Sequence, residues 1–302
     1  MTSLLEQLPP VRGRYTPNAD LKKYVWFQVG GPAEVLFKPK DVDDLCDFFK
    51  QKPSHVPVTI LGVGSNVLIR DGGIPGVTIK LGSGFSDIKI TDHTLEAGAG
   101  ALDRTVALTA AENGLGGFSF LAGIPGTMGG AVKMNAGAYG HEIKDIFQSC
   151  QIVTTNGTVQ EMNDVALTYR NSSLPEGSIV VKATFKGTPQ EPDLLYREIE
   201  KIMAERELSQ PVKSRTGGST FKNPPSKKAW ELIDQAGCRG HRIGDAMVSE
   251  KHCNFLINTG QATAADLELL GDYVQKQVLH TSGIPLEWEI RRLGIRKGED
   301  HA

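Results

Sequence analysis

The chain has 302 residues, enough for two or three domains and for a sizeable buried core. Its 33 basic and 35 acidic residues give a formal net charge of -2, which excludes the basic surface typical of nucleic-acid-binding proteins. No segment approaches the roughly 20 apolar residues of a membrane span, and the first residues lack the apolar core of a signal peptide. We therefore expect a cytoplasmic protein with neither a nucleic acid nor a membrane as partner.

The cysteines indicate neither a metal site nor a redox motif. All four lie far apart and form no C-x-x-C pair. His241 and His252 lie near Cys238 and Cys253, but their spacing matches no zinc site. We expect no metal, and scattered thiols of this kind fit a reducing compartment.

Short helices and strands are predicted in the first part of the chain. Asp41 is placed to cap a helix with apolar residues on one side, from Val42 to Phe49. Runs rich in β-branched residues and ended by glycine predict strands at 58–61, 67–70 and 77–81. A further helix is predicted over 102–113, where Asn113-Gly114 closes it.

A β-hairpin is the strongest local prediction. Asn156-Gly157 stands between two β-rich arms, Gln151–Thr155 and Thr158–Glu161. Asn-Gly is typical of tight hairpin turns because both residues tolerate positive φ angles. Another strand is predicted over 179–186.

A domain boundary is predicted where two prolines flank polar residues. Thr188–Pro192 has the composition of a linker between a strand and a helix. The boundary divides the chain into a C-terminal domain over 189–302 and two N-terminal parts over 1–80 and 81–188.

The C-terminal domain is predicted to mix helices and strands. Asp193 is placed to cap a helix with Leu195, Ile199, Ile202 and Met203 on its apolar face. A second helix is predicted over 230–236 and ends at Gly237. A third is predicted to begin after Thr263, which caps it, and to end at Gly283. Strands are predicted over 255–258 and 286–293. Because there is no steady βαβ alternation, the sequence indicates the α+β class.

Glycine is the one unusual feature of the composition. Of 34 glycines, 18 lie between Gly62 and Gly140. Gly62-Val-Gly-Ser-Asn66 begins like a dinucleotide fingerprint, but Val67 replaces the third glycine and a β run follows, so it is not a Rossmann motif. Two glycines followed by Ser65 and Asn66 nevertheless allow close backbone approach to a pyrophosphate.

A second block, Phe120–Tyr139, packs small residues and few charges into twenty positions. Turns of this kind can bind a phosphate through backbone N–H groups, without lysine or arginine. The chain has no Gly-Lys-Ser/Thr triplet, so a P-loop is excluded.

In its motifs the sequence resembles the UDP-N-acetylenolpyruvoylglucosamine reductases, over nearly its whole length. The resemblance is carried by Val29–Ala33, Gly62–Asn66, Gly123–Thr127, Gly129–Ala131, Met134–Gly137, Tyr169–Ser172, Gly217–Pro224 and Glu287–Arg291. It implies a vanillyl-alcohol-oxidase-like, PCMH-type FAD-binding domain in two parts and a C-terminal α+β substrate domain. It also implies FAD and NADPH as cofactors and UDP-N-acetylglucosamine enolpyruvate as substrate. We expect a monomer.

The resemblance assigns site residues position by position. The residues expected to bind FAD are Gly62, Gly64, Ser65, Asn66, Ala122, Gly123, Ile124, Pro125, Gly126, Gly129, Gly130, Ala131, Asn135 and Gly137. Those expected to bind substrate are Tyr169, Arg215, Lys222 and Asn223. Val25 stands where the family commonly has threonine, so no flavin contact is assigned to it. The chain resembles the shorter subclass, which lacks a loop with a substrate-covering tyrosine.

Three residues match the family's catalytic set. Reduction of an enolpyruvyl ether adds hydride at the terminal carbon and leaves negative charge at the carboxylate, where the fork of Arg170 can bind it. Ser219, in a Gly-Gly-Ser turn, is the expected donor of the proton to the α carbon. Glu289 can assist the enolate if it is itself protonated, which burial would favour.

Two alternatives stay open at this point. Another FAD-dependent oxidase or dehydrogenase of the same fold would share the glycine blocks but not Gly217–Pro224 or Glu287–Arg291. A non-catalytic flavin or sugar-nucleotide binding protein would keep the pocket and tolerate replacement of Ser219.

Overall fold

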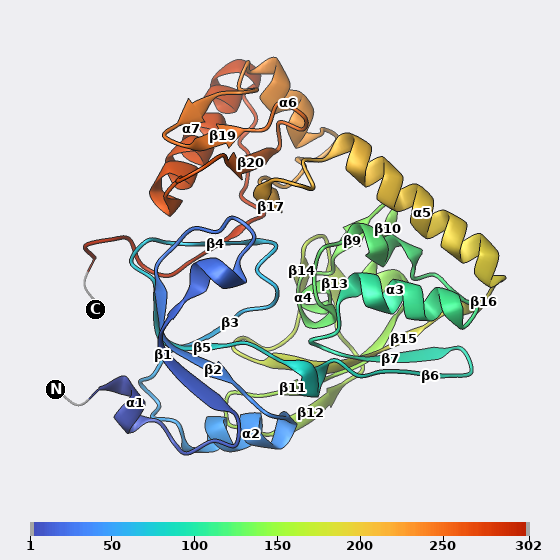
Figure 1. Cartoon of the computed structure of the whole chain (residues 1–302). Helices are drawn as coiled ribbons and strands as arrows, with labels where there is room; N and C mark the ends of the chain where they lie inside the picture. Colours follow the sequence, from blue (N-terminus) through green and yellow to red (C-terminus); the bar gives the residue numbers. More distant parts are fainter. Residues whose placement is uncertain (1–2, 300–302) are drawn as a thin grey trace. The chain divides into compact units, whose positions relative to one another are not determined.

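A computed structural model describes residues 3–299 (Figure 1). Its helices are α1 (Leu4–Gln7), α2 (Val42–Gln51), α3 (Asp103–Glu112), α4 (Met128–Lys133), α5 (Pro192–Ser209), α6 (Ala229–Gln235) and α7 (Ala264–Ser282). The strands up to the hairpin are β1 (Arg14–Asp20), β2 (Pro32–Lys38), β3 (Val58–Ile60), β4 (Val67–Ile69), β5 (Ile74–Ile79), β6 (Ile88–Thr91), β7 (Thr94–Gly98), β8 (Leu115–Gly116), β9 (Gly137–Ala138), β10 (His141–Glu142), β11 (Phe147–Val153) and β12 (Val159–Met162). The remaining strands are β13 (Leu167–Thr168), β14 (Asn171–Ser172), β15 (Ile179–Lys186), β16 (Thr188–Pro189), β17 (Arg215–Ser219), β18 (Arg242–Ile243), β19 (Ala246–Val248), β20 (Phe255–Asn258) and β21 (Arg291–Leu293).

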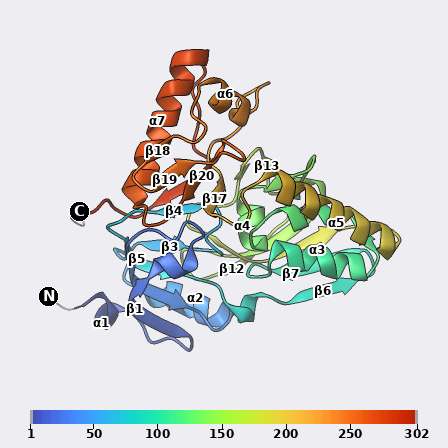
Figure 2. The same cartoon turned by 45° about the horizontal axis from the view of Figure 1, so that its top comes forward.

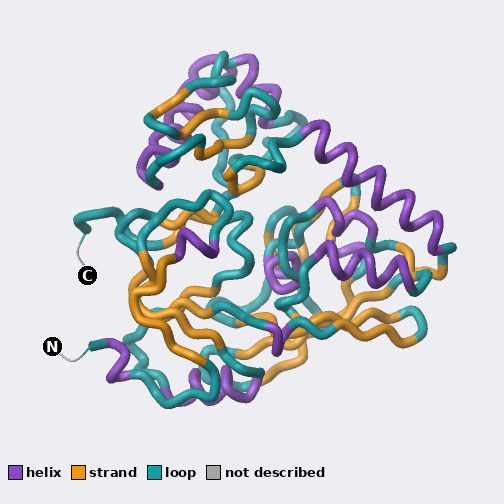
Figure 3. The backbone as a smooth tube through the Cα atoms, viewed as in Figure 1, coloured by secondary structure: helices purple, strands orange, loops and turns teal. Residues whose placement is uncertain are grey.

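The chain folds into two compact units, and each unit is made of three separate chain segments. Unit 1 comprises the chain up to Pro17, Val35–Gly62 and Gly76–Arg206. Unit 2 comprises Asn18–Glu34, Val63–Pro75 and the chain from Glu207. Figure 3 shows that most strands are short and that loops make up much of the backbone.

Unit 1 is built on a five-stranded antiparallel sheet in the order β12-β11-β15-β7-β6. Val180, Ala183 and Phe185 of β15 join one core, and Ile179 and Val181 join the other. The strand changes face at Val181, where its register with β11 is irregular. The first core contains residues of α3, α4 and α5 and the second contains residues of α2, so helices cover both faces of the sheet (Figure 1).

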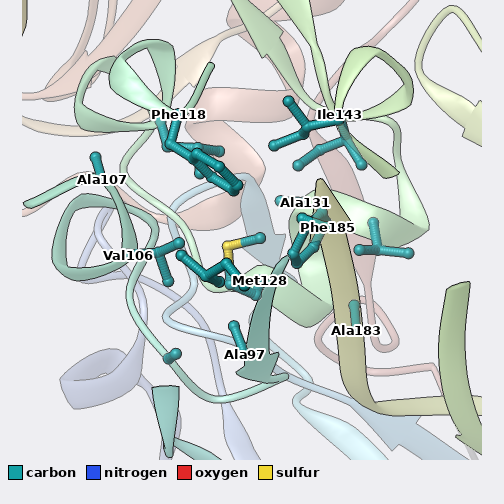
Figure 4. Packing of buried hydrophobic residues seen from close by; sticks show 14 of the residues in the cluster. Ala97, Val106, Ala107, Phe118, Met128, Ala131, Ile143, Ala183 and Phe185 are labelled. Atoms are coloured by element: carbon teal, nitrogen blue, oxygen red, sulfur yellow. The ribbon is translucent and has the colours of Figure 1, made fainter. Parts of the chain in front are cut away.

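The first core of unit 1 brings α3 and α4 onto the sheet. Figure 4 shows Val106 of α3, Met128 of α4 and Phe185 of β15 turned toward one another. All three side chains are fully buried. Small residues between them, including Ala131, allow this close packing, and the position of the glycine-rich block is thereby set by the core.

The predicted hairpin is confirmed as β11 and β12, but its turn differs from the prediction. Cys150 to Val153 pair in antiparallel register with residues of β12. Gly157 has a φ of 77°, whereas Asn156 is not among the residues with positive φ. Thr154 accepts a backbone hydrogen bond from Gly157, and Asn156 instead bonds through its side chain to neighbouring threonine hydroxyls.

Unit 2 contains the four-stranded sheet β17-β20-β19-β18, and Figure 2 shows α7 running beside these strands. As predicted, Thr263 caps α7 by accepting a hydrogen bond from Asp266 N–H at 3.0 Å, and Gly283 ends it at a φ of 70°. The strand β21 pairs in parallel with β4, far earlier in the chain.

Three boundary predictions need correction. The expected linker contains β16, whose Thr188 and Pro189 pair with β8. Helix α5 begins at Pro192, so Asp193 lies in its first turn instead of capping it, and the helix belongs to unit 1 as far as Arg206. Only Arg291–Leu293 of the strand expected over 286–293 is regular; before it, Trp288 forms a single bridge with Phe221.

Candidate active site

The turn after Gly64 lies in unit 2 and is held against the segment that contains Glu289. Gly64 has a φ of 69°, and a Cβ there would lie 2.2 Å from the Tyr24 carbonyl oxygen, so only glycine fits. The Asn66 amide donates to the Glu289 carbonyl at 3.3 Å, and its own carbonyl accepts from Arg291 N–H at 3.0 Å. Ser65 and Asn66, predicted to bind FAD, thus lie beside a predicted catalytic residue.

Ser219 ends β17 at an irregular point of the sheet. The register with β20 shifts between Thr216 and Ser219, and Gly218 has a φ of 80°. A Cβ on Gly217 would lie 2.4 Å from Phe27, and one on Gly218 would lie 3.7 Å from the Ser65 carbonyl oxygen. Glycine is therefore required at position 217 by the Phe27 ring and at position 218 by the positive φ, and the turn lies against the Ser65 turn.

Glu289 joins the same cluster through its backbone. Its N–H donates to the Thr220 carbonyl at 2.8 Å, one residue after Ser219. Unit 2 therefore brings together Ser65, Asn66, Ser219 and Glu289, which are far apart in the sequence. A hydroxyl and a carboxyl held on neighbouring backbones can supply a proton and a hydrogen bond to one small ligand.

The other predicted residues of unit 2 make contacts within the protein. Lys222 Nζ lies 3.2 Å from Glu287 Oε2 at an exposed position. The Asn223 side-chain oxygen accepts from Ala229 N–H at the start of α6, at 2.9 Å. Arg215 is exposed and donates to the Gly260 carbonyl at 2.9 Å.

In unit 1, most glycines of the second block are required by packing against the chain itself. A Cβ on Gly123 would lie 2.3 Å from the Tyr139 ring, and one on Gly129 would lie 2.8 Å from the Ala99 Cβ. A Cβ on Gly126 would lie 2.4 Å from Asp103 Oδ2. The excess of glycine thus reflects close packing of the protein as well as space for a ligand.

Gly62 and Gly130 differ, because both are exposed and a Cβ on either one would meet only a side-chain oxygen, tightly at Gly62 and in ordinary contact at Gly130. The nearest atom to a Cβ on either one is the Thr127 hydroxyl oxygen, at 3.2 and 3.9 Å. Lys80 Nζ donates a hydrogen bond to the Gly62 carbonyl. Burial, together with the neighbouring Lys38, lowers the pKa of Lys80, so a bound anion would stabilise its charged form. A side-chain-free surface with a cation at its edge fits a pyrophosphate.

Sequence reasoning missed Lys80. It lies at the end of a β-rich run, where one lysine carries no signal of its own. Only the folded chain shows its ammonium at Gly62. The remaining predicted FAD residues of the block are placed as follows: Ala122 and Ala131 are buried, and Ile124, Pro125 and Gly137 are half-buried.

Arg170 lies in unit 1, in the two-residue turn between β13 and β14. It has a positive φ of 57°, which is uncommon for a long side chain. Its guanidinium donates to the Gly137 carbonyl at 3.4 Å and lies 5.1 Å from the centre of the Tyr169 ring. The turn therefore brings two predicted residues of the substrate site to the glycine-rich block.

Asn135 links that turn to the block. It is fully buried, and its amide donates to the Thr168 carbonyl and to Glu142, both at 3.0 Å. Its side-chain oxygen accepts from Lys144 N–H at 2.9 Å. These contacts explain how Asn135 holds the Arg170 turn; its predicted contact with FAD stays a prediction.

Within residues 3–299, no three or more histidine, cysteine, aspartate or glutamate side chains gather in an arrangement suited to a metal ion. No helix in this described part is both long and apolar enough to cross a membrane.

Two family models match the chain. Residues 33–163 match the FAD binding domain, and residues 210–293 match the UDP-N-acetylenolpyruvoylglucosamine reductase C-terminal domain. The second match contains Ser219 and Glu289 and lies within unit 2.

Similar proteins cover almost the whole chain. UDP-N-acetylenolpyruvoylglucosamine reductases of Gluconobacter oxydans and Paramagnetospirillum magneticum are 56% and 53% identical to it, over 96% and 97% of this chain and 95% and 96% of their own lengths. The crystal structure of UDP-N-acetylenolpyruvylglucosamine reductase (MurB) from Thermus caldophilus is 34% identical with a TM-score of 0.81, covering 94% of this chain and 100% of that one. The predicted vanillyl-alcohol-oxidase-like α+β fold is confirmed by these matches.

Proposed function

The chain belongs to the UDP-N-acetylenolpyruvoylglucosamine reductase family, and we propose that Arg170, Ser219 and Glu289 carry the chemistry at its substrate. It is an FAD-dependent oxidoreductase that uses NADPH as reductant. It reduces UDP-N-acetylglucosamine enolpyruvate to UDP-N-acetylmuramate, a step of peptidoglycan precursor synthesis.

The surface at Gly62, Thr127 and Gly130 would hold the pyrophosphate of FAD, with Lys80 as its cation. Backbone N–H groups and one ammonium can bind this dianion without a basic protein surface, which agrees with the net charge of -2. When bound, FAD supplies the transfer of hydride from NADPH to the substrate.

Arg170 would bind the carboxylate of the enolpyruvyl group. Addition of hydride to the terminal carbon pushes negative charge onto this carboxylate, and a guanidinium that stays protonated stabilises it. The Gly137 carbonyl and the Tyr169 ring hold the guanidinium in place, so little reorganisation is needed during the reaction.

Ser219 would then donate a proton to the α carbon, and a protonated Glu289 would hydrogen-bond the enolate oxygen. The hydrogen bond from Glu289 N–H to the Thr220 carbonyl supports this assignment, because it places Ser219 and Glu289 on neighbouring backbone segments. Tyr169, Arg215, Lys222 and Asn223 would bind the sugar nucleotide, whose phosphates suit the cationic side chains among them.

We further propose that the enzyme works in the cytoplasm and as a monomer. The substrate is a charged nucleotide sugar, and the surface charge of the chain is nearly balanced. Sedimentation of the purified protein checks the oligomeric state; a stable dimer at micromolar concentration would contradict it.

One experiment tests the function as a whole. The purified protein should show flavin absorbance and should consume NADPH much faster when the enolpyruvyl sugar nucleotide is added. A colourless protein that binds no added FAD would contradict the function. A yellow protein whose NADPH consumption ignores this substrate would favour another oxidase of the same fold.

A further inference from the structure

Asn254 holds the backbone next to Ser219 from the neighbouring strand of the sheet. It lies just before β20 and is 4% exposed. Its side-chain oxygen accepts from Phe221 N–H at 3.0 Å, and its side-chain amide donates to the Phe221 carbonyl at 2.8 Å. Its backbone carbonyl accepts from Thr220 N–H at 2.7 Å. All three bonds therefore fall on the two residues that follow Ser219.

The backbone at Ser219 needs this support because its strand is only partly paired. The ladder between β17 and β20 is interrupted between Thr216 and Ser219, and it resumes only at the pair of Ser219 with Phe255. The two glycines before Ser219 leave its backbone few conformational restraints. Contacts after Ser219, together with its pairing to Phe255, therefore determine where its hydroxyl lies.

The residues after Ser219 are also hydrogen-bonded to the segment that contains Glu289. The Thr220 carbonyl accepts from Glu289 N–H at 2.8 Å, and Lys222 N–H donates to the Glu287 carbonyl at 2.8 Å. Asn254 thus restrains a segment that directly follows Ser219 and is hydrogen-bonded to the backbone of Glu289, the two proposed catalytic residues of unit 2.

The chemistry of the amide is essential to the arrangement. A buried side chain that both accepts from a backbone N–H and donates to the carbonyl of the same residue must carry an acceptor and a donor. Aspartate has nearly the same shape but would face the Phe221 carbonyl with an acceptor, and alanine would leave two buried backbone groups unpaired. Either change shifts the segment without touching Ser219 itself.

We propose that Asn254 is a positioning residue for the proton donor: it acts on the reaction through the placement of Ser219. This inference rests on the proposed role of Ser219. A displacement of about 1 Å can reduce a rate by roughly 10²-fold, which is the effect expected for Asn254→Ala and Asn254→Asp on transfer to the substrate.

The test separates the two half-reactions of the FAD-loaded enzyme by stopped-flow absorbance. Reduction of the flavin by NADPH should keep its rate in both variants, while reoxidation by the enolpyruvyl substrate should slow about 10²-fold. In a Ser219→Ala background, adding Asn254→Asp should slow reoxidation far less than it does in wild type, because there is no Ser219 hydroxyl left to position and only the placement of Glu289 can still change. Losses that add in the double variant would overturn the proposal.

Asn258→Ala is the matched control. Asn258 is equally buried in β20 and bonds through its side chain to Phe27, Gly260 and Ala262, not to the Ser219 segment. It should lower the melting temperature comparably while leaving the ratio of the two half-reaction rates unchanged. The same change of ratio in Asn258→Ala would show a general structural effect and would overturn the proposal, as would failure of both Asn254 variants to fold and bind FAD. A Ser219→Ala enzyme that reoxidises at the normal rate would instead contradict the proposed role of Ser219.

Discussion

Asp103 is a carboxylic acid in surroundings that suit only its neutral form. It is fully buried at the start of α3, and within the described part of the chain neither of its oxygens has a hydrogen-bond partner. Burial raises its pKa well above the ordinary value. Since an unpaired buried carboxylate is costly, the protein is expected to keep this residue protonated, next to Gly126 of the flavin block.

The stability of the protein should therefore depend on pH through Asp103. A raised pKa in the folded state means that its contribution is complete below the unfolded pKa of about 3.9 and is lost as the pH rises toward the folded value. Across that interval wild type should lose up to about 1.4 kcal/mol per pH unit relative to Asp103→Asn, which cannot ionise. Urea denaturation of both proteins at several pH values measures the difference; parallel curves would show that Asp103 does not titrate.

Ser219→Ala should separate the two half-reactions. Removal of the hydroxyl leaves the flavin site and its reduction by NADPH intact, but the substrate loses its proton donor. Reoxidation should slow by roughly 10² to 10⁴-fold, the usual contribution of a positioned general acid. Rapid-mixing absorbance of the reduced enzyme with substrate gives the rate, and equal losses in both half-reactions would refute the role as donor.

Lys80→Met should weaken the binding of FAD more than that of riboflavin, which lacks phosphates. A charge-assisted hydrogen bond contributes about 1.5–3 kcal/mol, so the Kd for FAD should rise roughly tenfold to a hundredfold. Fluorescence titration of the apoprotein with each flavin measures the two affinities. Lys89→Met, which removes an equal charge from an exposed position of β6, should change neither. If both flavins weaken equally, Lys80 only supports the Gly62 turn.

At the scale of elements, prediction succeeded where local chemistry decides the structure. Asp41 and Thr263 cap α2 and α7 through side-chain bonds that depend on residues three positions away. The two-residue strands β8 and β16 have no such signal, since they form only because distant segments meet. The same distinction applies to the residues of the site. The glycine before Ser219 can be recognised as a motif in the sequence, whereas the hydrogen bonds of Asn254 and Lys80 form only in the folded chain.

At Gly271, packing against a neighbouring side chain outweighs the general preference of a helix for alanine over glycine. It lies inside α7, where alanine normally stabilises a helix by about 1 kcal/mol relative to glycine. A Cβ there would lie 2.1 Å from the Trp288 indole, which is held by a 3.1 Å bond to Gln275 and by the Phe221 ring. Overpacking of this kind costs about 1–3 kcal/mol, so Gly271→Ala should destabilise the protein.

Chemical denaturation of Gly271→Ala measures this change in the free energy of unfolding. In a Trp288→Ala background the obstacle is gone, and the same substitution should become neutral or stabilising. A stabilising effect of Gly271→Ala in wild type would show that the indole moves aside without cost.

At the scale of the whole molecule, the fold of the predicted C-terminal domain depends on residues from much earlier in the chain. Its core includes Phe27, Val29 and Leu68, which precede residue 189 by more than a hundred positions. Strand β21 pairs with β4, so part of the secondary structure of the unit also depends on the earlier segments. These contacts have large sequence separations and no local signal, which is why composition alone placed the boundary at the prolines.

A fragment of residues 189–302 should therefore not fold on its own. Besides core side chains, it lacks Asp71, which accepts from Ala264 and Ala265 N–H at the start of α7, and Arg70, which pairs with buried Glu268 at 3.0 Å. Far-UV circular dichroism in urea should show no cooperative transition for the fragment. Full-length Asp71→Ala loses only the two bonds to the start of α7 and keeps the core and the Arg70–Glu268 pair, so it should unfold cooperatively with a loss of about 1 kcal/mol. A cooperative transition of the fragment would mean that its helices and strands make a sufficient core by themselves, and that the early segments add the flavin-site turn to a domain already folded.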